Sequence, residues 1–268
     1  MATIERYTHG HHDSVLRTHS WRTVDNSAAY LVPHLVPGAS VLDVGSGPGT
    51  ITVDIGRRVA GGRVVGIDAA EDVRDQAQAL ADDNGLTNVE FQVGDAYHLE
   101  FPDDTFDVVH AHQVLQHVAD PVAVLREMRR VVKPGGVVAA RDVIYGGAVW
   151  HPLLPGLRKW MDVYQAVARF NGGDPDGGSS LKAWAMEAGF EDISTGASIW
   201  CFADDADREW WGGNWAVRAL ESSFAPQSIE AGAATLEDLQ EVSEAWKTWV
   251  ADKTGWFAMP HGEILATK

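Results

Sequence analysis

The stretch VLDVGSGPGT, residues 41–50, decides the fold of this chain. An apolar run typical of a β-strand leads into Asp43, three glycines follow at alternate positions, and a segment with helical spacing begins at Thr50. Glycines suit such a turn because the backbone must bend tightly and approach a ligand closely. The dinucleotide fingerprint G-x-G-x-x-G would need glycine at position 50, where this chain has threonine. The loop therefore indicates a small-molecule site but lacks the dinucleotide pattern.

Strand-like and helical segments alternate along the chain from Ala39 to Asp142. Short apolar runs predict strands at residues 39–45, 62–68, 88–95, 106–112 and 136–142. Apolar residues at helical spacing predict helices at residues 49–60, 71–85 and 119–136, the second ended by Gly85 and the third by Pro134-Gly135-Gly136. Strand, helix, strand in succession predicts a parallel sheet, and therefore an α/β fold.

The pattern changes after Asp142, where further elements are added to the core. Helices are predicted at residues 151–170 and 179–190 and within a tryptophan-rich segment at about 204–252, and strands at 192–202 and 256–268. We therefore expect one domain over residues 1–268, with a core at 39–142 and helical insertions at 143–180 and 204–252 that cover the substrate.

Composition limits the classes of partner. Lys and Arg number 21 against 38 Asp and Glu, giving a formal charge of −17 that would repel nucleic acid or an anionic membrane. No segment approaches the run of about 20 apolar residues that crosses a membrane. The opening residues lack a signal-peptide pattern, and the single cysteine, Cys201, has no partner for an internal disulfide. We expect a cytoplasmic monomer or homodimer with a small-molecule partner, although acidity also serves solubility.

The acid-x-Gly-x-Gly-x-Gly pattern starting at Asp43 resembles the class I S-adenosylmethionine (SAM) dependent methyltransferases. The resemblance continues with Asp68 in VVGIDAA and Asp95 in VGDAYHLEFPDDTFDVV, and it covers residues 39–142. Residues 94–136 are particularly similar to methyltransferases of quinone biosynthesis and their small-molecule relatives. This family implies a Rossmann-like, seven-stranded, mostly parallel sheet whose last strand is antiparallel, flanked by helices, with SAM as cofactor.

The resemblance also implies which residues bind SAM. Asp68 would accept both ribose hydroxyls, Asp95 would bind the adenine amino group, and the exit of the fourth strand would hold the methionyl portion. The cofactor-binding residues expected on this basis are Tyr7, Arg22, Asp43, Gly45, Ser46, Gly47, Asp68, Ala69, Gly94, Asp95, Ala96, Ala111, His112 and Gln113.

Methyl transfer from a sulfonium requires the acceptor to be held in line with the methyl group, at roughly 3 to 3.5 Å. If the acceptor must lose a proton, His117, alone or paired with Asp142, is the candidate general base and these two are the candidate catalytic residues. The alternative is that His117 only packs or positions a neighbour. The sequence leaves open whether carbon, oxygen or nitrogen is methylated.

Ten of the eleven tryptophans lie at Trp150 or later, outside the cofactor core. Large aromatic side chains commonly fix added helices to a domain by packing. Some of them would also suit the wall of an acceptor pocket, which favours an apolar or aromatic acceptor. Tyr145, just beyond the fifth strand, is a candidate substrate-binding residue.

The histidine-rich stretch YTHGHHDSVLRTHSWR, residues 7–22, has three possible interpretations: an expression tag, a metal site or part of an active-site lid. It is not an uninterrupted tag, and no acidic or cysteine partner completes a known metal-ligand spacing, so no metal is expected. We expect residues 1–38 to form a lid, with a helix at 23–35. Arg22 would lie near the SAM carboxylate and Tyr7 near the cofactor, whereas His19 and Trp21 would contact the acceptor.

Two other functions share these features. A dinucleotide-dependent oxidoreductase would have a similar sheet, but Thr50 and the position of Asp95 disfavour it. A SAM-binding protein that does not methylate would carry the same cofactor motifs, so the sequence does not separate it from a methyltransferase.

Overall fold

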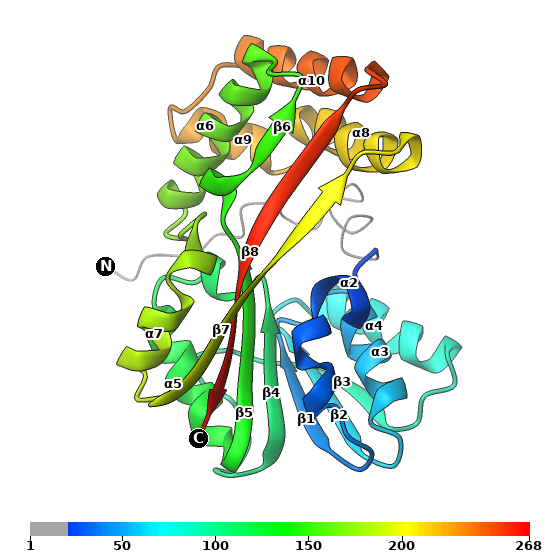
Figure 1. Cartoon of the computed structure of the whole chain (residues 1–268), viewed down its shortest axis with the longest axis vertical. Helices are drawn as coiled ribbons and strands as arrows, with labels where there is room; N and C mark the ends of the chain where they lie inside the picture. Colours follow the sequence, from blue (N-terminus) through cyan, green and yellow to red (C-terminus); the bar gives the residue numbers. More distant parts are fainter. Residues whose placement is uncertain (1–20) are drawn as a thin grey trace.

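A computed structural model of the chain describes residues 21–268 and has two lobes (Figure 1). In the lower lobe, helices cover a twisted sheet, and in the upper lobe α6, α8, α9 and α10 pack around the extended ends of β7 and β8. The strands are β1 (Ser40–Val44), β2 (Arg63–Asp68), β3 (Val89–Val93), β4 (Phe106–His112), β5 (Val132–Val143), β6 (Val149–His151), β7 (Asp192–Phe202) and β8 (Trp256–Thr267). The α-helices are α2 (Val24–Ser27), α3 (Thr50–Arg58), α4 (Glu71–Asp83), α5 (Pro121–Val131), α6 (Pro155–Phe170), α7 (Leu181–Glu187), α8 (Asp205–Glu221), α9 (Phe224–Glu230) and α10 (Leu236–Ala251). Short 3-10 helices are η1 (Ala29–His34), η2 (Leu115–His117), η3 (Tyr145–Gly147) and η4 (Gly177–Ser179).

The sheet has the predicted mixed topology. Its order is β3-β2-β1-β4-β5-β8, with β7 on the far side of β8. Strands β1 to β5 pair in parallel, and β8 is antiparallel to both β5 and β7. The predicted mostly parallel sheet with an antiparallel last strand is confirmed. The described residues form eight strands instead of seven, because β6 pairs with Trp256–Ala258 of β8 beyond the end of β5.

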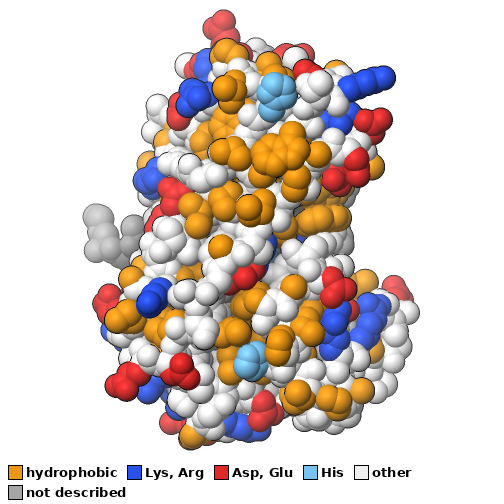
Figure 2. All heavy atoms as spheres, in the orientation of Figure 1, with side chains coloured by type: hydrophobic (Ala, Val, Ile, Leu, Met, Phe, Trp, Pro, Cys, Tyr) orange, Lys and Arg blue, Asp and Glu red, His pale blue; other side chains and the backbone are white. Residues whose placement is uncertain are grey.

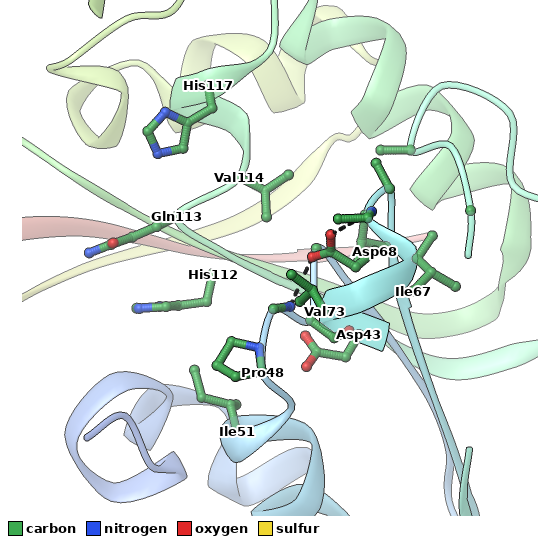
Figure 3. Close-up of a pocket in the computed structure, with 18 of the residues that line it drawn as sticks. Asp43, Pro48, Ile51, Ile67, Asp68, Val73, His112, Gln113, Val114 and His117 are labelled. Atoms are coloured by element: carbon green, nitrogen blue, oxygen red, sulfur yellow. Dashed lines mark hydrogen bonds between the residues drawn. The ribbon is translucent and has the colours of Figure 1, made fainter. Parts of the chain in front are cut away.

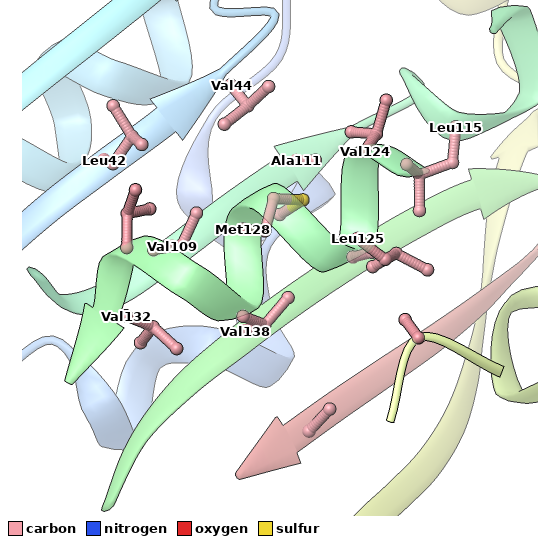
Figure 4. Close-up of a cluster of buried hydrophobic side chains, with 14 of the residues drawn as sticks. Leu42, Val44, Val109, Ala111, Leu115, Val124, Leu125, Met128, Val132 and Val138 are labelled. Atoms are coloured by element: carbon pink, nitrogen blue, oxygen red, sulfur yellow. The ribbon is translucent and has the colours of Figure 1, made fainter. Parts of the chain in front are cut away.

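The strand order reverses between β1 and β4, which places a crevice at the carboxyl ends of these strands. Apolar clusters hold both faces of the sheet. On one face, Val109, Ala111 and Val138 pack against Leu125 and Met128 of α5 (Figure 4). On the other face, α3, α4 and η1 cover the sheet. The crevice is therefore built on a rigid, doubly covered sheet.

Two predicted helices differ from the structure. The helix predicted at 119–136 ends at Val131, and β5 already begins at Val132. Gly135 has a positive φ of 78°, and a register shift between Phe106 and Val108 of β4 accommodates the extra residues of β5 before Val137. The helix predicted at 23–35 divides at Ala28 into α2 and the 3-10 helix η1, which contains Pro33, a residue that donates no backbone hydrogen bond.

The upper lobe has an aromatic core formed by the tryptophan-rich insertion. Trp160 of α6 is fully buried, with its ring centroid 4.8 Å from that of Trp215 and 5.0 Å from that of Trp246. Both contacts are edge-to-face, the arrangement that aromatic pairs prefer. Most of these tryptophans therefore pack between helices. No helix within residues 21–268 has the length and apolar character that crossing a membrane needs.

Candidate functional site

A cavity of about 690 Å³ lies at the carboxyl ends of β1 to β4 (Figure 3). Its volume is within the range of sites for small molecules and cofactors. Its lining residues are Arg22, Asp43, Val44, Gly45, Ser46, Gly47, Pro48, Thr50, Ile51, Ile67, Asp68, Ala69, Ala70, Val73, Val93, Gly94, Asp95, Ala96, Tyr97, His112, Gln113, Val114, His117 and Val118. Most of the residues expected from the sequence to bind the cofactor therefore line one cavity.

The glycine loop forms the floor of this cavity. Gly45, Gly47 and Gly49 all have positive φ, at 68°, 53° and 81°. A Cβ atom on Gly45 would lie 2.4 Å from Cγ2 of Val114, which leaves no room for any other residue. All three positions therefore favour glycine by backbone conformation, and Gly45 and Gly49 also by close packing.

Asp68 ends β2 at the mouth of the cavity. One of its carboxylate oxygens accepts a hydrogen bond from the Gly47 backbone N–H at 3.0 Å, and the other accepts from the Ala70 N–H at 3.1 Å. These bonds fix the carboxylate beside the glycine loop (Figure 3). Ala69, the next residue, also lines the cavity.

Asp95 follows β3 on the adjacent side of the cavity. Its carboxylate accepts from the Tyr97 backbone N–H at 2.8 Å and remains largely exposed. The Gly94 N–H donates to the Asp68 carbonyl at 3.0 Å, so the loops after β2 and β3 are tied together. Two carboxylates therefore flank one apolar space, which Ile67 and Val73 help to form.

Asp43 occupies a different environment. It is buried, and its two oxygens accept from the Thr52 hydroxyl at 2.5 Å and contact His110 Nδ1 at 2.8 Å. Both partners are side chains of neighbouring elements, so the carboxylate anchors the start of the glycine loop to α3 and β4. Its direct contact with the cofactor stays a prediction.

The exit of β4 forms the end of the cavity nearest the upper lobe. Gln113 has a positive φ of 54°, which is unusual for a residue other than glycine. Its side-chain oxygen accepts from Arg22 Nη2 at 2.7 Å, and its amide nitrogen lies 2.9 Å from Nε2 of His261 on β8. Burial and the charges of Arg141 and Arg22 hold the pKa of His261 well below its ordinary value, so its neutral ring can accept from Gln113. Ala111 differs from its neighbours in this segment because it is packed in the core and does not line the cavity.

His117 lies in η2, one turn beyond β4. Gln116 accepts from the Val143 backbone N–H through its side-chain oxygen, so its amide nitrogen, 3.0 Å from His117 Nε2, is the donor. Burial and the charge of Arg22 lower the pKa of His117 to about 3, and the ring is neutral near pH 7.

Asp142 does not join His117 in the cavity. Its side chain is fully buried and accepts from the Gln116 backbone N–H at 3.4 Å, and no hydrogen bond links it to the His117 ring among residues 21–268. Burial raises the pKa of Asp142 to about 7. The expected pairing of these two residues is therefore not found, and Asp142 instead supports the turn that carries His117. Alternate residues of a strand point to opposite faces, and Asp142 points toward α5, away from His112.

Comparisons with known proteins agree with this geometry. The chain matches the family described as Methyltransferase domain over residues 35–189, more than half of its length. An uncharacterized methyltransferase of Schizosaccharomyces pombe is 37% identical over 278 residues, covering 98% of this chain and 96% of the relative.

The chain belongs to the class I SAM-dependent methyltransferase family. A probable methyltransferase of Aspergillus luteorubrus is 33% identical over 289 residues, covering 98% of this methyltransferase and 97% of the relative. The demethylmenaquinone methyltransferase of Lactococcus lactis is 34% identical over 128 residues, 47% of this chain and 48% of its own length. The YcgJ protein of Bacillus subtilis shares the fold, with a TM-score of 0.59, 21% identity and coverage of 94% and 98%. The resemblance that began at the glycine loop is confirmed.

The residues expected to contact the acceptor of this methyltransferase are not brought together in the cavity. Trp21 packs on upper-lobe aromatics, 5.1 Å from Trp210 and 5.4 Å from Trp200 between ring centroids, and it does not line the cavity. Tyr145 is buried and stacks on Tyr164 at 3.8 Å. Tyr7 and His19 lie outside the described residues, so their roles stay predictions.

Three residues that lie beside the site without lining the cavity carry no recognisable sequence motif. His261 and Trp200 reach the exit of β4 from β8 and β7, and Arg141 reaches it from β5. Only pairing between distant segments brings them there, so no local pattern could have found them. Within residues 21–268, no three His, Cys, Asp or Glu side chains are placed to share a metal ion.

Proposed function

We propose that this protein transfers the methyl group of SAM to a small apolar or aromatic acceptor and releases S-adenosylhomocysteine. The observation that carries the proposal is one cavity in which the glycine loop, Asp68 and Asp95 meet, with its far end opening toward an aromatic lobe. A small-molecule acceptor agrees with the formal charge of −17, which opposes nucleic-acid binding.

The residues present fit SAM. The positive-φ glycines let the loop turn tightly at the cavity, and Gly45, Ser46 and Gly47 line it where the amino-acid portion of SAM is expected. Asp68 keeps lone pairs for the two ribose hydroxyls, and Asp95 faces the apolar slot that suits adenine. When bound, SAM supplies an electrophilic methyl group on sulfur, and the protein has only to orient it.

The acceptor space is proposed at the end of the cavity where His117 lies, beside Arg22, His112 and Gln113, which are expected to hold the methionyl portion of SAM. Trp200 does not line the cavity but lies behind His112, with the two ring centroids 5.8 Å apart. Aromatic side chains behind this end of the cavity help to exclude water and favour a flat acceptor. Residues 143–180 and 204–252 would then act as a substrate cap.

We propose His117 as the residue that receives a proton from the acceptor, through Nε2. The ring is neutral near pH 7, the form that this step needs, but its pKa of about 3 makes it a weak base. It takes the proton as the methyl group bonds to the acceptor, because that bond makes the acceptor's proton strongly acidic. The Gln116 amide now occupies Nε2 and would yield it to the acceptor. Asp142 is a positioning residue in this scheme, because it acts on the backbone of the same turn.

His117→Ala and His117→Asn separate the two roles of the histidine. Asparagine retains a hydrogen-bond donor but accepts no proton, so both variants should lose methyl transfer by about 10²- to 10⁴-fold if His117 is the base. Recovery of activity in the asparagine variant alone would assign a donor role to His117 instead.

The proposed function is tested by two measurements on the purified protein. Calorimetry should show binding of SAM and S-adenosylhomocysteine, and no binding of NAD(P), which the rival oxidoreductase would require. Incubation of SAM carrying a labelled methyl group with a metabolite extract should then give a labelled product. Cofactor binding with no labelled product from any extract would support a SAM-binding protein that does not methylate.

A further inference from the structure

The backbone turns sharply at Gln113, the first residue after β4. Its φ of 54° lies in the left-handed region, which only two residues other than glycine adopt within residues 21–268. The other is the exposed Asp104, and aspartate is enriched in this conformation, whereas glutamine is not. Such a conformation persists only where the surrounding structure holds it in place.

This turn places the residues at the exit of β4. His112, Gln113 and Val114 are consecutive, and all three line the cavity. Val114 packs on the glycine loop, since its Cγ2 lies only 2.4 Å from the position that a Cβ on Gly45 would take. The 3-10 helix η2, which carries His117, begins directly after Val114. A change of φ at Gln113 would therefore move both the cavity wall beside the glycine loop and the turn that carries His117.

The side chain of Gln113 is held at both ends by a chain of hydrogen bonds. Its oxygen accepts from Arg22 Nη2 at 2.7 Å, and its amide nitrogen lies 2.9 Å from His261 Nε2. On the other side of the ring, His261 Nδ1 lies 3.1 Å from the Met259 carbonyl oxygen. A carbonyl can only accept, so Nδ1 donates to it and Nε2 accepts from Gln113. An arginine can only donate, so both ends of the chain impose the same orientation on the Gln113 amide.

The His261 ring belongs to the fold and does not line the cavity. It is fully buried on β8, where its register partners are Val143 of β5 and Ser198 of β7. Burial and the charge of Arg141 hold the pKa of His261 well below its ordinary value, so the ring is neutral near pH 7. Its Nε2 therefore keeps the lone pair that the Gln113 amide needs.

The backbone hydrogen bond of Gln113 does not fix this φ. Its N–H donates to the Arg141 carbonyl at 2.7 Å and extends the pairing of β4 with β5. Rotation about the N–Cα bond leaves this hydrogen bond intact but moves the side chain and the rest of the turn. The bonds from Arg22 and His261 to the side chain therefore resist that rotation.

We propose that His261 is a positioning residue, which acts through Gln113 to hold the left-handed turn after β4 in the conformation that binds the cofactor. The inference rests on the proposed function, because it adds a residue to the SAM site. The two side-chain bonds of Gln113 offset the unfavourable backbone conformation, so the cavity has its binding shape before SAM arrives. His261 itself touches neither cofactor nor acceptor in this scheme.

Gln113→Gly and Gln113→Ala separate the turn from the side chain. Both substitutions remove the two side-chain bonds, but glycine adopts a positive φ without steric cost and alanine does not. Calorimetry measures the affinity of each folded variant for S-adenosylhomocysteine. We expect the glycine variant to stay within about fivefold of the unmodified protein. The alanine variant should bind about five- to thirtyfold more weakly than the glycine variant, because only a fraction of its molecules have the binding conformation. Equal affinities of the two variants would overturn the proposal.

His261→Leu and His261→Gln test the histidine itself. Leucine removes the acceptor, so the affinity for S-adenosylhomocysteine should fall about two- to tenfold, the contribution of one hydrogen bond. The side-chain oxygen of glutamine reaches the position of the histidine Nε2, so His261→Gln should restore most of the affinity. In the Gln113→Gly background, His261→Leu should have no further effect, because the bond through which it acts is already absent. Equal losses in both backgrounds, or an unchanged affinity in His261→Leu, would refute the positioning role.

The matched control is Ile264→Ala, which removes another buried side chain of β8, on the opposite face of the sheet. It should lower the free energy of unfolding and leave the affinity for S-adenosylhomocysteine unchanged. His261→Phe, which keeps a ring without nitrogen atoms, replaces the leucine variant if that variant does not fold.

The outcomes separate this inference from the function on which it rests. If S-adenosylhomocysteine fails to bind the unmodified protein, the proposed function fails. If it binds and the variants of Gln113 and His261 behave like the Ile264→Ala control, only the positioning inference fails.

Discussion

Substitution of Gly45 by alanine gives the sharpest test of the glycine loop, because the chain contains a matched control. Gly45 and Gly85 have nearly the same positive φ, 68° and 67°. A Cβ on Gly45 would lie 2.4 Å from Val114 Cγ2, whereas a Cβ on Gly85 would meet no atom within 4 Å. The two substitutions thus share the backbone cost and differ in the steric contact.

The expected magnitudes follow from these two terms. Placing alanine in a left-handed conformation costs about 1 to 2 kcal/mol in either variant. Carbon atoms pack at about 3.5 to 4.0 Å, so in Gly45→Ala the loop or Val114 must move by about 1 Å, an overpacking cost of about 1 to 3 kcal/mol. We expect the free energy of unfolding to fall by about 2 to 5 kcal/mol in Gly45→Ala and by about 1 to 2 kcal/mol in Gly85→Ala.

Chemical denaturation and calorimetry measure the two consequences. SAM affinity should fall at least about tenfold in Gly45→Ala, because the displaced glycine loop forms the floor of the cavity. It should be unchanged in Gly85→Ala. Adding Val114→Ala to Gly45→Ala removes the atom at 2.4 Å and should recover stability relative to the sum of the single changes. Equal destabilisation of the two glycine variants, or strict additivity in the double variant, would refute the steric argument.

Three further outcomes are expected. Asp68→Asn should weaken SAM binding by about ten- to a hundredfold, because a charged acceptor of ribose hydrogen bonds is lost. Calorimetric titration with SAM measures the affinity, and an unchanged value would contradict the ribose assignment. The pKa of Asp142 is raised from 3.8 to about 7, so between these values only the folded state binds the proton, and its contribution to stability is lost as pH rises from 3.8 to about 7 and changes no further above that; unfolding of Asp142→Asn should show a gain over the unmodified protein at pH 8 but not at pH 3.5, and identical pH profiles would argue against it. Trp160→Ala should cost about 3 to 5 kcal/mol of unfolding free energy by opening the upper-lobe core, whereas a loss below 1 kcal/mol would show that this core is not tightly packed.

On the face shown in Figure 2, the charged side chains form no large patch of one sign. Acidic and basic side chains are interspersed over the face in Figure 2, and the surface narrows between the two lobes. Near the cavity, buried Arg141 and half-buried Arg22 both lie beside the ring of Trp200.

The sequence by itself determined the cofactor half of this protein. Glycines at a strand-to-helix turn and acids at the ends of the next two strands depend on local chain geometry, and parallel pairing then places them at one edge. The division of the predicted helix at 23–35 and the early start of β5 at Val132 were missed, because propensity does not show where pairing with a neighbouring strand takes over.

Only the tertiary structure decided the acceptor half. His261 and Trp200 meet the exit of β4 because β8 pairs antiparallel with β5 and β7 pairs antiparallel with β8, which brings residues from Asp192 onward beside the core. The alternation of side chains along β5 turns Asp142 into the core beneath η2 and directs Arg141 to His112. Adjacent residues of a strand thus lie on opposite faces of the sheet. The packing of the neighbouring strands determines which of these faces borders the cavity.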